Sequence, residues 1–336
     1  MFGSLRLLLA LLVALSHVGV SVRGYHLGVP AVVVFLLLSG YVVAAMLHGA
    51  PAWRAFWAER ALRLLPPYYT AAALGVGVWL LSGAAIPFFS GAGQPALWLA
   101  ALAIIPLNYA TLWPVLDTFT PVPPAWSLGL EIQFYLLAPW LLAAPRRAAL
   151  AWAASAAVGA AAQLGLLPSD AFGYRLLVGN LYIFLSGAAL YWVQHGPAAN
   201  AARWRAALYL TWAGVAVVAA ATAALGRWGT PFVAEVAVGY LLGLPLVAAL
   251  ARLSRRRWDD ALAHLAYPLF LVHFAALWAL QGAGRQPSPQ APLALAAYLC
   301  LALALAAAVH LVAQRPWLHW RRRLRAAAQA APSCGA

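Results

Sequence analysis

Apolar runs long enough to cross a bilayer recur along almost the whole sequence, and they constrain the fold more than any other feature. A membrane-spanning helix needs about 20 consecutive, predominantly apolar residues. The sequence therefore predicts an all-α integral membrane protein with about ten transmembrane helices. The expected spans lie near residues 5–22, 28–47, 66–85, 127–144, 149–167, 176–194, 206–226, 231–251, 261–281 and 291–313.

The composition agrees with this reading. Hydrophobic residues make up 65% of the 336-residue chain and charged residues only 8%, whereas a soluble domain carries about 25% charged residues. The formal charge of +14 does not predict a nucleic-acid partner, because the arginines fall between the apolar runs rather than on one soluble face. All basic residues other than histidine are arginines, and alanine is abundant. This pattern is typical of a GC-rich genome, so we expect the cytoplasmic membrane of a bacterium.

The distribution of arginine predicts the orientation of the chain. If the N-terminus lies inside, seventeen arginines face the cytoplasm and four face outward. The outer four are Arg23, Arg175, Arg227 and Arg285. This asymmetry follows the positive-inside rule closely and places both termini inside.

The same rule identifies one apolar stretch that does not cross. Arg63 and Arg146 are both expected inside, yet three apolar stretches separate them, so one must be irregular or re-entrant. The proline-rich region 103–125 is the best candidate, because irregular backbone survives at membrane depth only where it lines a protein cavity. We expect one transmembrane domain over 1–313 and a short basic cytoplasmic tail over 314–336, which would contact anionic headgroups.

A histidine stands well inside the first apolar run, RLLLALLVALSHVG. His17 follows Arg6 by eleven residues, which puts both side chains on one helix face about 16 Å apart along the axis. Such a pair suits a long ligand with a charged end at the cytoplasmic mouth and a reactive end in the membrane. The alternative is a topology-setting arginine and a hydrogen-bonded interior histidine. Ionisable residues at this depth are more often functional.

Two further stretches carry polar residues at unusual places. In FWAERALRLLPPYY, Arg60 and Arg63 share a helix face and would suit phosphate oxygens; the alternative is topology-setting charges with a Glu59–Arg63 pair. In WSLGLEIQFYLLAPWLL, Glu131 is a carboxylate at membrane depth. It could orient or deprotonate His17, or bind a sugar hydroxyl; the alternative is a position at the outer interface.

These stretches, taken in chain order, resemble the membrane-bound acyltransferase 3 family. The matching features are Arg6 and His17, then Ser39, Gly40 and Tyr41 in VVVFLLLSGYVV, then Arg60, Arg63 and Pro66, then Trp126, Ser127, Glu131 and Phe134, and last Tyr267 and His273 in LAYPLFLVHFAAL. The resemblance implies an integral membrane enzyme with ten spans. It would move an acyl group, commonly acetyl, from cytoplasmic acyl-CoA to a hydroxyl of a glycan or lipid-linked sugar of the cell envelope.

The resemblance also implies roles for residues. His17 and Glu131 would be catalytic, with His17 acting as general base or through an acyl-histidine intermediate. Arg6, Arg60 and Arg63 would bind the donor. The possible cavity residues are Ser39, Tyr41, Trp126, Ser127 and His273. Acyl-CoA is then a substrate rather than a resident cofactor. The eight histidines are scattered, so no metal site is predicted.

A transporter or flippase for an anionic lipid or glycan is the rival interpretation, since arginines and buried histidines also line transport paths. Transporters commonly contain internal repeats, and the two halves of this sequence show no convincing self-similarity. A non-catalytic polysaccharide export component is a further alternative, although it would need no histidine at a fixed spacing from Arg6. The acceptor, the acyl group and the oligomeric state stay open.

Overall fold

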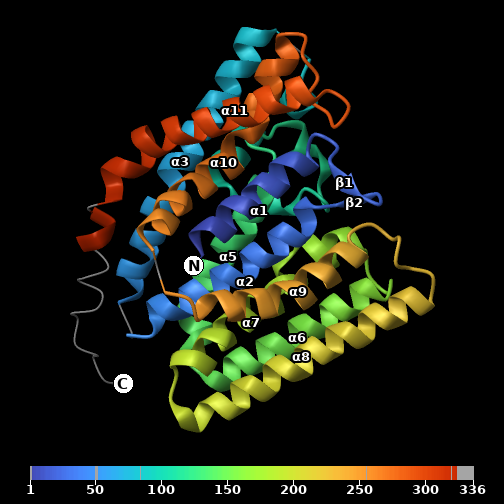
Figure 1. The fold of residues 1–336 in the computed structure, drawn as a ribbon, viewed down its shortest axis with the longest axis vertical. Helices are drawn as coiled ribbons and strands as arrows, with labels where there is room; N and C mark the ends of the chain where they lie inside the picture. Colours follow the sequence, from blue (N-terminus) through green and yellow to red (C-terminus); the bar gives the residue numbers. More distant parts are fainter. Residues whose placement is uncertain (1, 50–51, 84, 255, 319, 324–336) are drawn as a thin grey trace. The chain divides into compact units, whose positions relative to one another are not determined.

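The computed structural model describes residues 2–49, 52–83, 85–254, 256–318 and 320–323, and these are almost entirely helical (Figure 1). The elements are α1 (Gly3–Ser16), β1 (Ser21–Val22), β2 (Tyr25–His26), α2 (Gly28–Leu47), α3 (Trp53–Ser82), η1 (Pro87–Phe89), α4 (Pro95–Ala103), η2 (Ile105–Tyr109), η3 (Pro114–Thr118), α5 (Ala125–Leu142), α6 (Pro145–Gln163), η4 (Ser169–Arg175), α7 (Leu177–His195), α8 (Ala198–Ala224), α9 (Val233–Ala251), α10 (Arg257–Gly282), α11 (Pro292–Val309), η5 (His310–Gln314) and η6 (Arg315–Trp317).

Within the described residues, seven helices are long and apolar enough to cross a membrane. They are Gly28–Leu47, Trp53–Ser82, Ser169–His195, Ala198–Ala224, Val233–Ala251, Arg257–Gly282 and Pro292–Trp317. The all-helical fold is thus confirmed, whereas the count of ten crossings is not. The remaining three expected spans correspond to α1, α5 and α6, which are short or interrupted by polar residues.

Helix α1 is shorter than the first apolar run. It has 14 residues and is therefore about 21 Å long, less than the ~30 Å hydrocarbon core. The chain turns at Gly19, where φ is +86°, and then forms a hairpin pairing Ser21 with His26. The two hairpin turn residues, Arg23 and Gly24, both have positive φ, as a type I′ turn requires. Hydropathy alone overlooks this turn because the valines around it are apolar.

The proline-rich region expected to be irregular is confirmed as such. Helix α4 has only nine residues and is followed by the 3₁₀ segments η2 and η3. The Phe89 ring stacks on Trp79 at 4.8 Å between centroids and packs edge-on against Trp278 at 5.3 Å. Within the region, the Phe119 ring is buried and lies 5.7 Å from Phe89 and 4.3 Å from Trp98 between centroids, whereas Leu112, Trp113 and Val115 are exposed.

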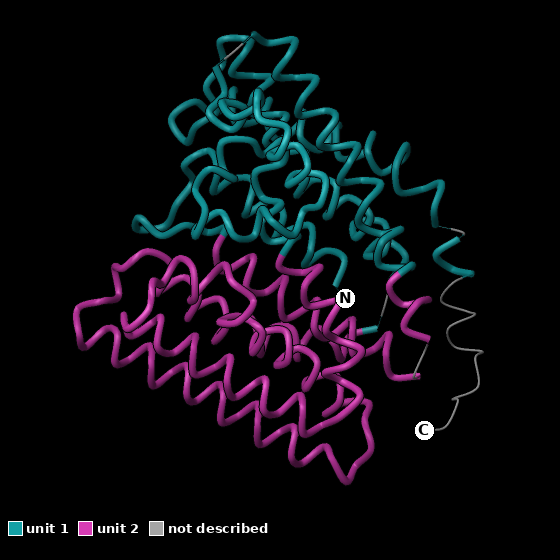
Figure 2. Tube along the Cα trace, turned by 180° about the vertical axis from the view of Figure 1, so that it is seen from behind, with its two compact units in different colours: residues 1–28, 58–129, 254–323 teal, residues 29–57, 130–253, 324–336 magenta. Residues whose placement is uncertain are grey.

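The chain divides into two compact units, coloured separately in Figure 2. Unit 1 contains residues 1–28, 58–129 and 254–323, and unit 2 contains residues 29–57, 130–253 and 324–336. Each unit is assembled from segments distant in sequence. The sequence expectation of a single transmembrane domain stays a prediction.

Unit 1 is organised around α10, which packs against both α1 and α11. The hydroxyl of Tyr298 on α11 donates a hydrogen bond to the Ala14 carbonyl of α1 at 3.1 Å. On the other side, the hydroxyl of Tyr267 on α10 donates to the Leu64 carbonyl of α3 at 3.0 Å. Helix α10 therefore links α1 to α3, the helix that carries Arg60 and Arg63.

Unit 2 is centred on α7, whose residues are almost all buried from Gly179 to Leu190. It meets α2 at two glycines. A Cβ on Gly40 would lie 1.8 Å from the Phe184 carbonyl oxygen, and one on Gly187 would lie 2.0 Å from that of Leu37. Only glycine permits so close an approach of two helices. Helix α8, by contrast, leaves large apolar side chains exposed, as a lipid-facing helix does.

Candidate active site

The N-terminus of α1 is capped by a carboxylate from α10. Asp259 accepts hydrogen bonds from the backbone N–H of Gly3 at 3.0 Å and from both the N–H and the hydroxyl of Ser4 at 2.8 Å. The helix has no side-chain cap of its own. Because a helix N-terminus carries unpaired N–H groups and partial positive charge, Asp259 supplies the cap that the local sequence lacks.

The same contact fixes the register of the two helices. A Cβ on Gly3 would lie 1.7 Å from the backbone oxygen of Asp259, so the backbones of α1 and α10 are in contact here. His17 follows Gly3 by fourteen residues and His273 follows Asp259 by fourteen. Both spacings correspond to a rise of about 21 Å. Two helices that start together at Asp259 thus bring their histidines to the same level.

The two imidazoles are hydrogen-bonded. Nε2 of His273 lies 3.2 Å from Nδ1 of His17, and the ring centroids are 5.1 Å apart with planes at 27°. Nδ1 of His17 also lies 2.9 Å from the Val13 carbonyl, and Nδ1 of His273 lies 3.3 Å from the Leu269 carbonyl. A carbonyl only accepts, so both Nδ1 atoms carry hydrogen. The single Nδ1 hydrogen of His17 is then shared between the Val13 carbonyl and Nε2 of His273, and the basic lone pair of His17 is on Nε2.

The two histidines differ in accessibility. His273 is fully buried, at 0% exposure, whereas His17, the C-cap residue of α1, is exposed. Phe274 packs against His17 at 4.8 Å between ring centroids, and Phe88 packs against Phe274 at 5.7 Å. The short η1 segment, through Phe88, therefore lies beside the imidazole pair. Only His17 of this pair can meet a substrate, and His273 can act only through it.

Arg6 lies near the opposite end of α1. The helix begins at Gly3 and ends at Ser16, so Arg6 and His17 occupy the two ends of one helix, as their spacing predicts. Eleven residues correspond to about 16 Å of helix. The Arg6 side chain is half-buried.

Arg60 forms a buried ion pair with Glu59. Its Nη2 lies 2.6 Å from Oε2 of Glu59, and the two side chains are 3% and 2% exposed. The other carboxylate oxygen, Oε1, accepts from both Nε and Nη2 of Arg321 at 3.1 Å. One carboxylate is thus shared by two guanidinium groups from distant parts of the sequence.

Arg63 lies one helical turn beyond Arg60 and is half-buried. Among the described residues none forms a hydrogen bond or ion pair with its guanidinium. The sequence alternative was a Glu59–Arg63 pair, whereas the salt bridges of Glu59 in the structure join it to Arg60 and Arg321. Arg60 and Arg63 are the two predicted donor-binding arginines of this motif. Arg60 is paired with Glu59, whereas the Arg63 guanidinium has no partner among the described residues.

Glu131 belongs to unit 2 and is held by two hydroxyl groups. Ser39 of α2 donates a hydrogen bond to its Oε1 at 2.7 Å, and the Tyr135 hydroxyl donates to the same oxygen. Ser39 also lies 3.2 Å from the Tyr135 hydroxyl. Two donors on one oxygen fix the direction of the carboxylate. Sequence reasoning named Ser39 as a possible cavity residue and did not identify Tyr135.

The remaining predicted cavity residues have local partners. The Tyr41 hydroxyl donates to Oε1 of Gln194 at 2.9 Å, near the end of α7. The Ser127 hydroxyl donates to the Pro124 carbonyl at 3.0 Å in the first turn of α5. The Trp126 carbonyl accepts from Nδ2 of Asn108 at 3.2 Å. These contacts tie down helix ends, and a substrate-binding role for them stays a prediction.

The predicted site residues divide between the units. Unit 1 holds Arg6, His17, Arg60, Arg63, Trp126, Ser127 and His273, and unit 2 holds Ser39, Tyr41 and Glu131. Sequence reasoning missed Asp259, Tyr135 and Arg321. Tyr135 follows Glu131 by four residues, a spacing that places two side chains on one helix face. No sequence signal connects Asp259 to Gly3 or Arg321 to Glu59.

Comparison with known proteins gives a family match over most of the chain. A family model described as an acyltransferase domain matches residues 3–311. A protein of Aquifex aeolicus (strain VF5), described as uncharacterized, is 34% identical over 176 residues, which cover 50% of this chain and 77% of that protein. No solved structure matches the chain.

Proposed function

Because the chain belongs to the acyltransferase 3 family, we propose that this multi-pass membrane acyltransferase moves an acyl group from cytoplasmic acyl-CoA to a hydroxyl. The expected acyl group is acetyl. The expected acceptor is a glycan or a related component of the cell envelope, and the expected location is the cytoplasmic membrane of a bacterium. The observation that carries this proposal is the hydrogen-bonded imidazole pair of His17 and His273.

The imidazole pair fits the requirements of a general base. The Val13 carbonyl and His273 together accept the Nδ1 hydrogen of His17 and so favour one tautomer, with the basic nitrogen Nε2 on the exposed ring. A third group that orients the base is the recurrent arrangement where a hydroxyl must be activated. Here the buried imidazole of His273 has that position.

The arginines of unit 1 suit the phosphates of coenzyme A. Arg6 stands at the other end of α1 from His17, about 16 Å along the helix, and Arg63 has no partner among the described residues. Guanidinium groups bind phosphate oxygens through paired N–H donors. We infer that the phosphates stay with these arginines while the extended pantetheine arm brings the thioester toward His17.

The transfer then proceeds with a balanced exchange of one proton. Nε2 of His17 takes the proton of the acceptor hydroxyl as the hydroxyl oxygen attacks the thioester carbonyl carbon. The carbon–sulfur bond breaks, and the departing thiolate takes the proton from the imidazolium. The products are an ester and free coenzyme A, and His17 is regenerated. A positioned general base contributes typically about 10² to 10⁴ in rate.

An acyl-histidine route is also consistent with this geometry. In that route Nε2 of His17 attacks the thioester carbonyl itself, coenzyme A leaves as thiolate, and the acceptor hydroxyl takes the acyl group in a second step. The two routes differ in whether acyl label stays on the protein when no acceptor is present. Glu131 keeps its predicted role toward the acceptor hydroxyl, oriented by Ser39 and Tyr135.

The experiment uses the full chain in lipid nanodiscs with radiolabelled acetyl-CoA. Wild type, His17→Ala and the control His26→Ala are compared for coenzyme A binding, thioester loss and label on the protein. His26 lies exposed in the β1–β2 hairpin, ten residues from α1, and is a matched imidazole deletion. We expect His17→Ala to bind coenzyme A as wild type does and to lose at least about 10²-fold in thioester consumption.

The outcomes separate the alternatives. Label that remains on wild type but not on His17→Ala supports the acyl-histidine route, and thioester loss without label supports direct transfer. A wild type that neither binds coenzyme A nor consumes any short acyl-CoA contradicts the proposed donor. The transporter interpretation, which has no support in the family match, would then require a transport assay in vesicles.

A further inference from the structure

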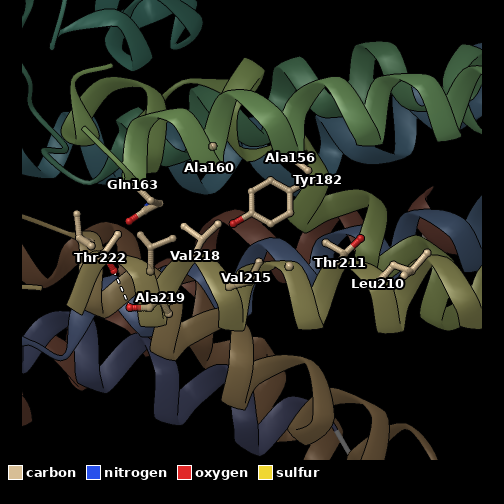
Figure 3. Close-up of a pocket in the computed structure, with 15 residues that line it drawn as sticks. Ala156, Ala160, Gln163, Tyr182, Leu210, Thr211, Val215, Val218, Ala219 and Thr222 are labelled. Atoms are coloured by element: carbon tan, nitrogen blue, oxygen red, sulfur yellow. Dashed lines mark hydrogen bonds between the residues drawn. The ribbon is translucent and has the colours of Figure 1, made fainter. Parts of the chain in front are cut away.

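Unit 2 contains a cavity of about 300 Å³ between α6, α7, α8 and α9, remote in sequence from the residues discussed above (Figure 3). Its walls are mostly small aliphatic side chains, such as Ala160, Val218 and Ala237. A Cβ on Gly214, which also lines the cavity, would meet no atom within 4 Å. Small residues on neighbouring helices leave this space unfilled, and its lining is suited to a hydrocarbon ligand.

The length of the cavity matches one leaflet of a bilayer. Its lining on α8 runs from Leu210 to Thr222, which corresponds to about 18 Å of helix. The hydrocarbon core of a bilayer is about 30 Å thick, so the cavity is slightly longer than one leaflet. A single acyl chain of a bilayer lipid fits this length, whereas a long polyprenyl chain would extend well beyond it.

Two polar groups that line the cavity, Gln163 at one end and Tyr182 nearer the middle, lack hydrogen-bond partners within the described part of the chain (Figure 3). Gln163 is 9% exposed, and its Oε1 is buried and unpartnered. The hydroxyl of Tyr182 also forms no hydrogen bond with a described residue, and Figure 3 shows it directed toward the α8 side chains. A buried polar atom without a partner is costly. A ligand with an acceptor for Tyr182 and a donor for Gln163 would remove that cost.

A positive charge lies just beyond the end that holds Gln163. The backbone N–H of Arg227 donates to the Thr222 carbonyl at 2.8 Å. Its guanidinium covers Gly165, two residues after Gln163, so closely that a Cβ there would lie 2.1 Å from its central carbon. The buried Nε of Arg227 has no hydrogen-bond partner among the described residues. A guanidinium in this position suits a phosphate group.

We propose that this cavity binds one acyl chain of a phosphatidylglycerol-like phospholipid of the outer leaflet. The chain lies along α8, the ester region meets Tyr182, a headgroup hydroxyl donates to Gln163, and the phosphate contacts Arg227. The predicted orientation of the chain places Gln163 and Arg227 toward the outer face, where such a headgroup would lie. The lipid site does not depend on the proposed acyl transfer.

The test measures lipid binding to the full chain by native mass spectrometry after reconstitution in nanodiscs that contain phosphatidylcholine and phosphatidylglycerol. Gly214→Leu fills the cavity, and Arg227→Gln removes the charge. The matched controls are Gly77→Leu, at a helix glycine where a Cβ also meets no atom within 4 Å, and Arg285→Gln, at an exposed arginine.

We expect wild type and both controls to retain phosphatidylglycerol in preference to phosphatidylcholine. Each test variant should retain it at least about tenfold less, because each removes either the chain site or a charge-assisted hydrogen bond. Retention by Gly214→Leu equal to wild type would overturn the cavity as the chain site. Equal retention of the two lipids by wild type would overturn the headgroup assignment. Displacement of phosphatidylglycerol by an added polyprenyl phosphate would overturn the outer-leaflet phospholipid as occupant.

Discussion

At the residue scale, the hydrogen bond between His17 and His273 is the main feature of the candidate active site in unit 1. The two residues are 256 positions apart, yet their ring nitrogens lie 3.2 Å from one another. The exposed ring can contact substrate, and the buried ring can only orient it. We therefore regard His273 as a positioning residue. This division of roles leads to a prediction that separates orientation from donor binding.

His273→Ala should lower kcat by on the order of tenfold, because one hydrogen bond to the base is worth about 1 kcal/mol. The KM for acyl-CoA should stay unchanged, since His273 is buried and does not contact the donor. His273→Asn should recover part of the loss, because its side-chain oxygen can accept the Nδ1 hydrogen of His17. Steady-state kinetics in nanodiscs provide the measurement. Equal activity of the Ala and Asn variants would argue against an orienting hydrogen bond.

At the element scale, α1 depends on another helix for its start and for its register. Asp259 caps the first turn, and the glycine at position 3 allows backbone contact. A 14-residue helix is marginal in isolation, so its orientation comes from α10. The same helix carries Arg6 at one end and His17 at the other, so the cap affects both predicted substrate contacts.

Asp259→Ala should destabilise the protein by about 0.5–2 kcal/mol, the usual cost of losing a helix cap. We expect a lower midpoint of thermal unfolding in detergent and a fall in acyl transfer, because α1 loses its register. Asp259→Asn keeps one acceptor oxygen and should fall between the two. The neighbouring Asp260→Ala removes the same charge from an exposed side chain and serves as the control. An equal loss in both alanine variants would assign the effect to charge rather than to capping.

The contact between α2 and α7 gives a second prediction for elements. A Cβ on Gly40 would lie 1.8 Å from a carbonyl oxygen of α7, so Gly40→Ala should cost about 1–3 kcal/mol through overpacking. Gly77→Ala on α3, where a Cβ meets no atom, should instead stabilise by about 0.5–1 kcal/mol. Thermal unfolding of the two variants should therefore shift in opposite directions. A Gly40→Ala midpoint at or above that of wild type would contradict close packing here.

At the scale of the whole molecule, the distribution of arginine predicts which loops face the cytoplasm. Ser254 lies in the loop between α9 and α10, among expected inner arginines, and Ser288 lies between α10 and α11, beside the expected outer Arg285. The two loops flank a single helix, so the prediction requires them to lie on opposite sides. Membrane topology can be measured without reference to activity.

Cysteines introduced at these two serines should label on opposite sides of the membrane. The background carries serine in place of Cys300, which is exposed, and of Cys334, which is outside the described residues. We expect Ser288→Cys to react with a membrane-impermeant maleimide in intact cells, and Ser254→Cys to react only after permeabilisation. Labelling of both from outside would contradict a crossing by α10, and the reverse pattern would invert the predicted orientation.

The sequence was informative wherever the physical cause is local. Hydropathy over about 20 residues marks segments that favour lipid, and the prolines between 103 and 125 exclude a regular span. Helical periodicity placed Arg6 and His17 at the two ends of one helix. Hydropathy was less informative at helix ends, because the turn at Gly19 lies among valines. Of the ten spans it predicted, seven correspond to long apolar helices among the described residues.

The sequence by itself thus determined the membrane class, the helical fold and the polar residues at membrane depth, since hydropathy and helix period are properties of neighbouring residues. Only the tertiary structure decided which partners those residues have. The pairing of His17 with His273 depends on the register of α1 and α10, which the Asp259 contact sets. The sharing of the Glu59 carboxylate depends on the C-terminal part of the chain bringing Arg321 next to α3. A hydrogen bond is directional and forms only within about 3 Å. Partners distant in sequence are therefore set by helix packing and not by local pattern.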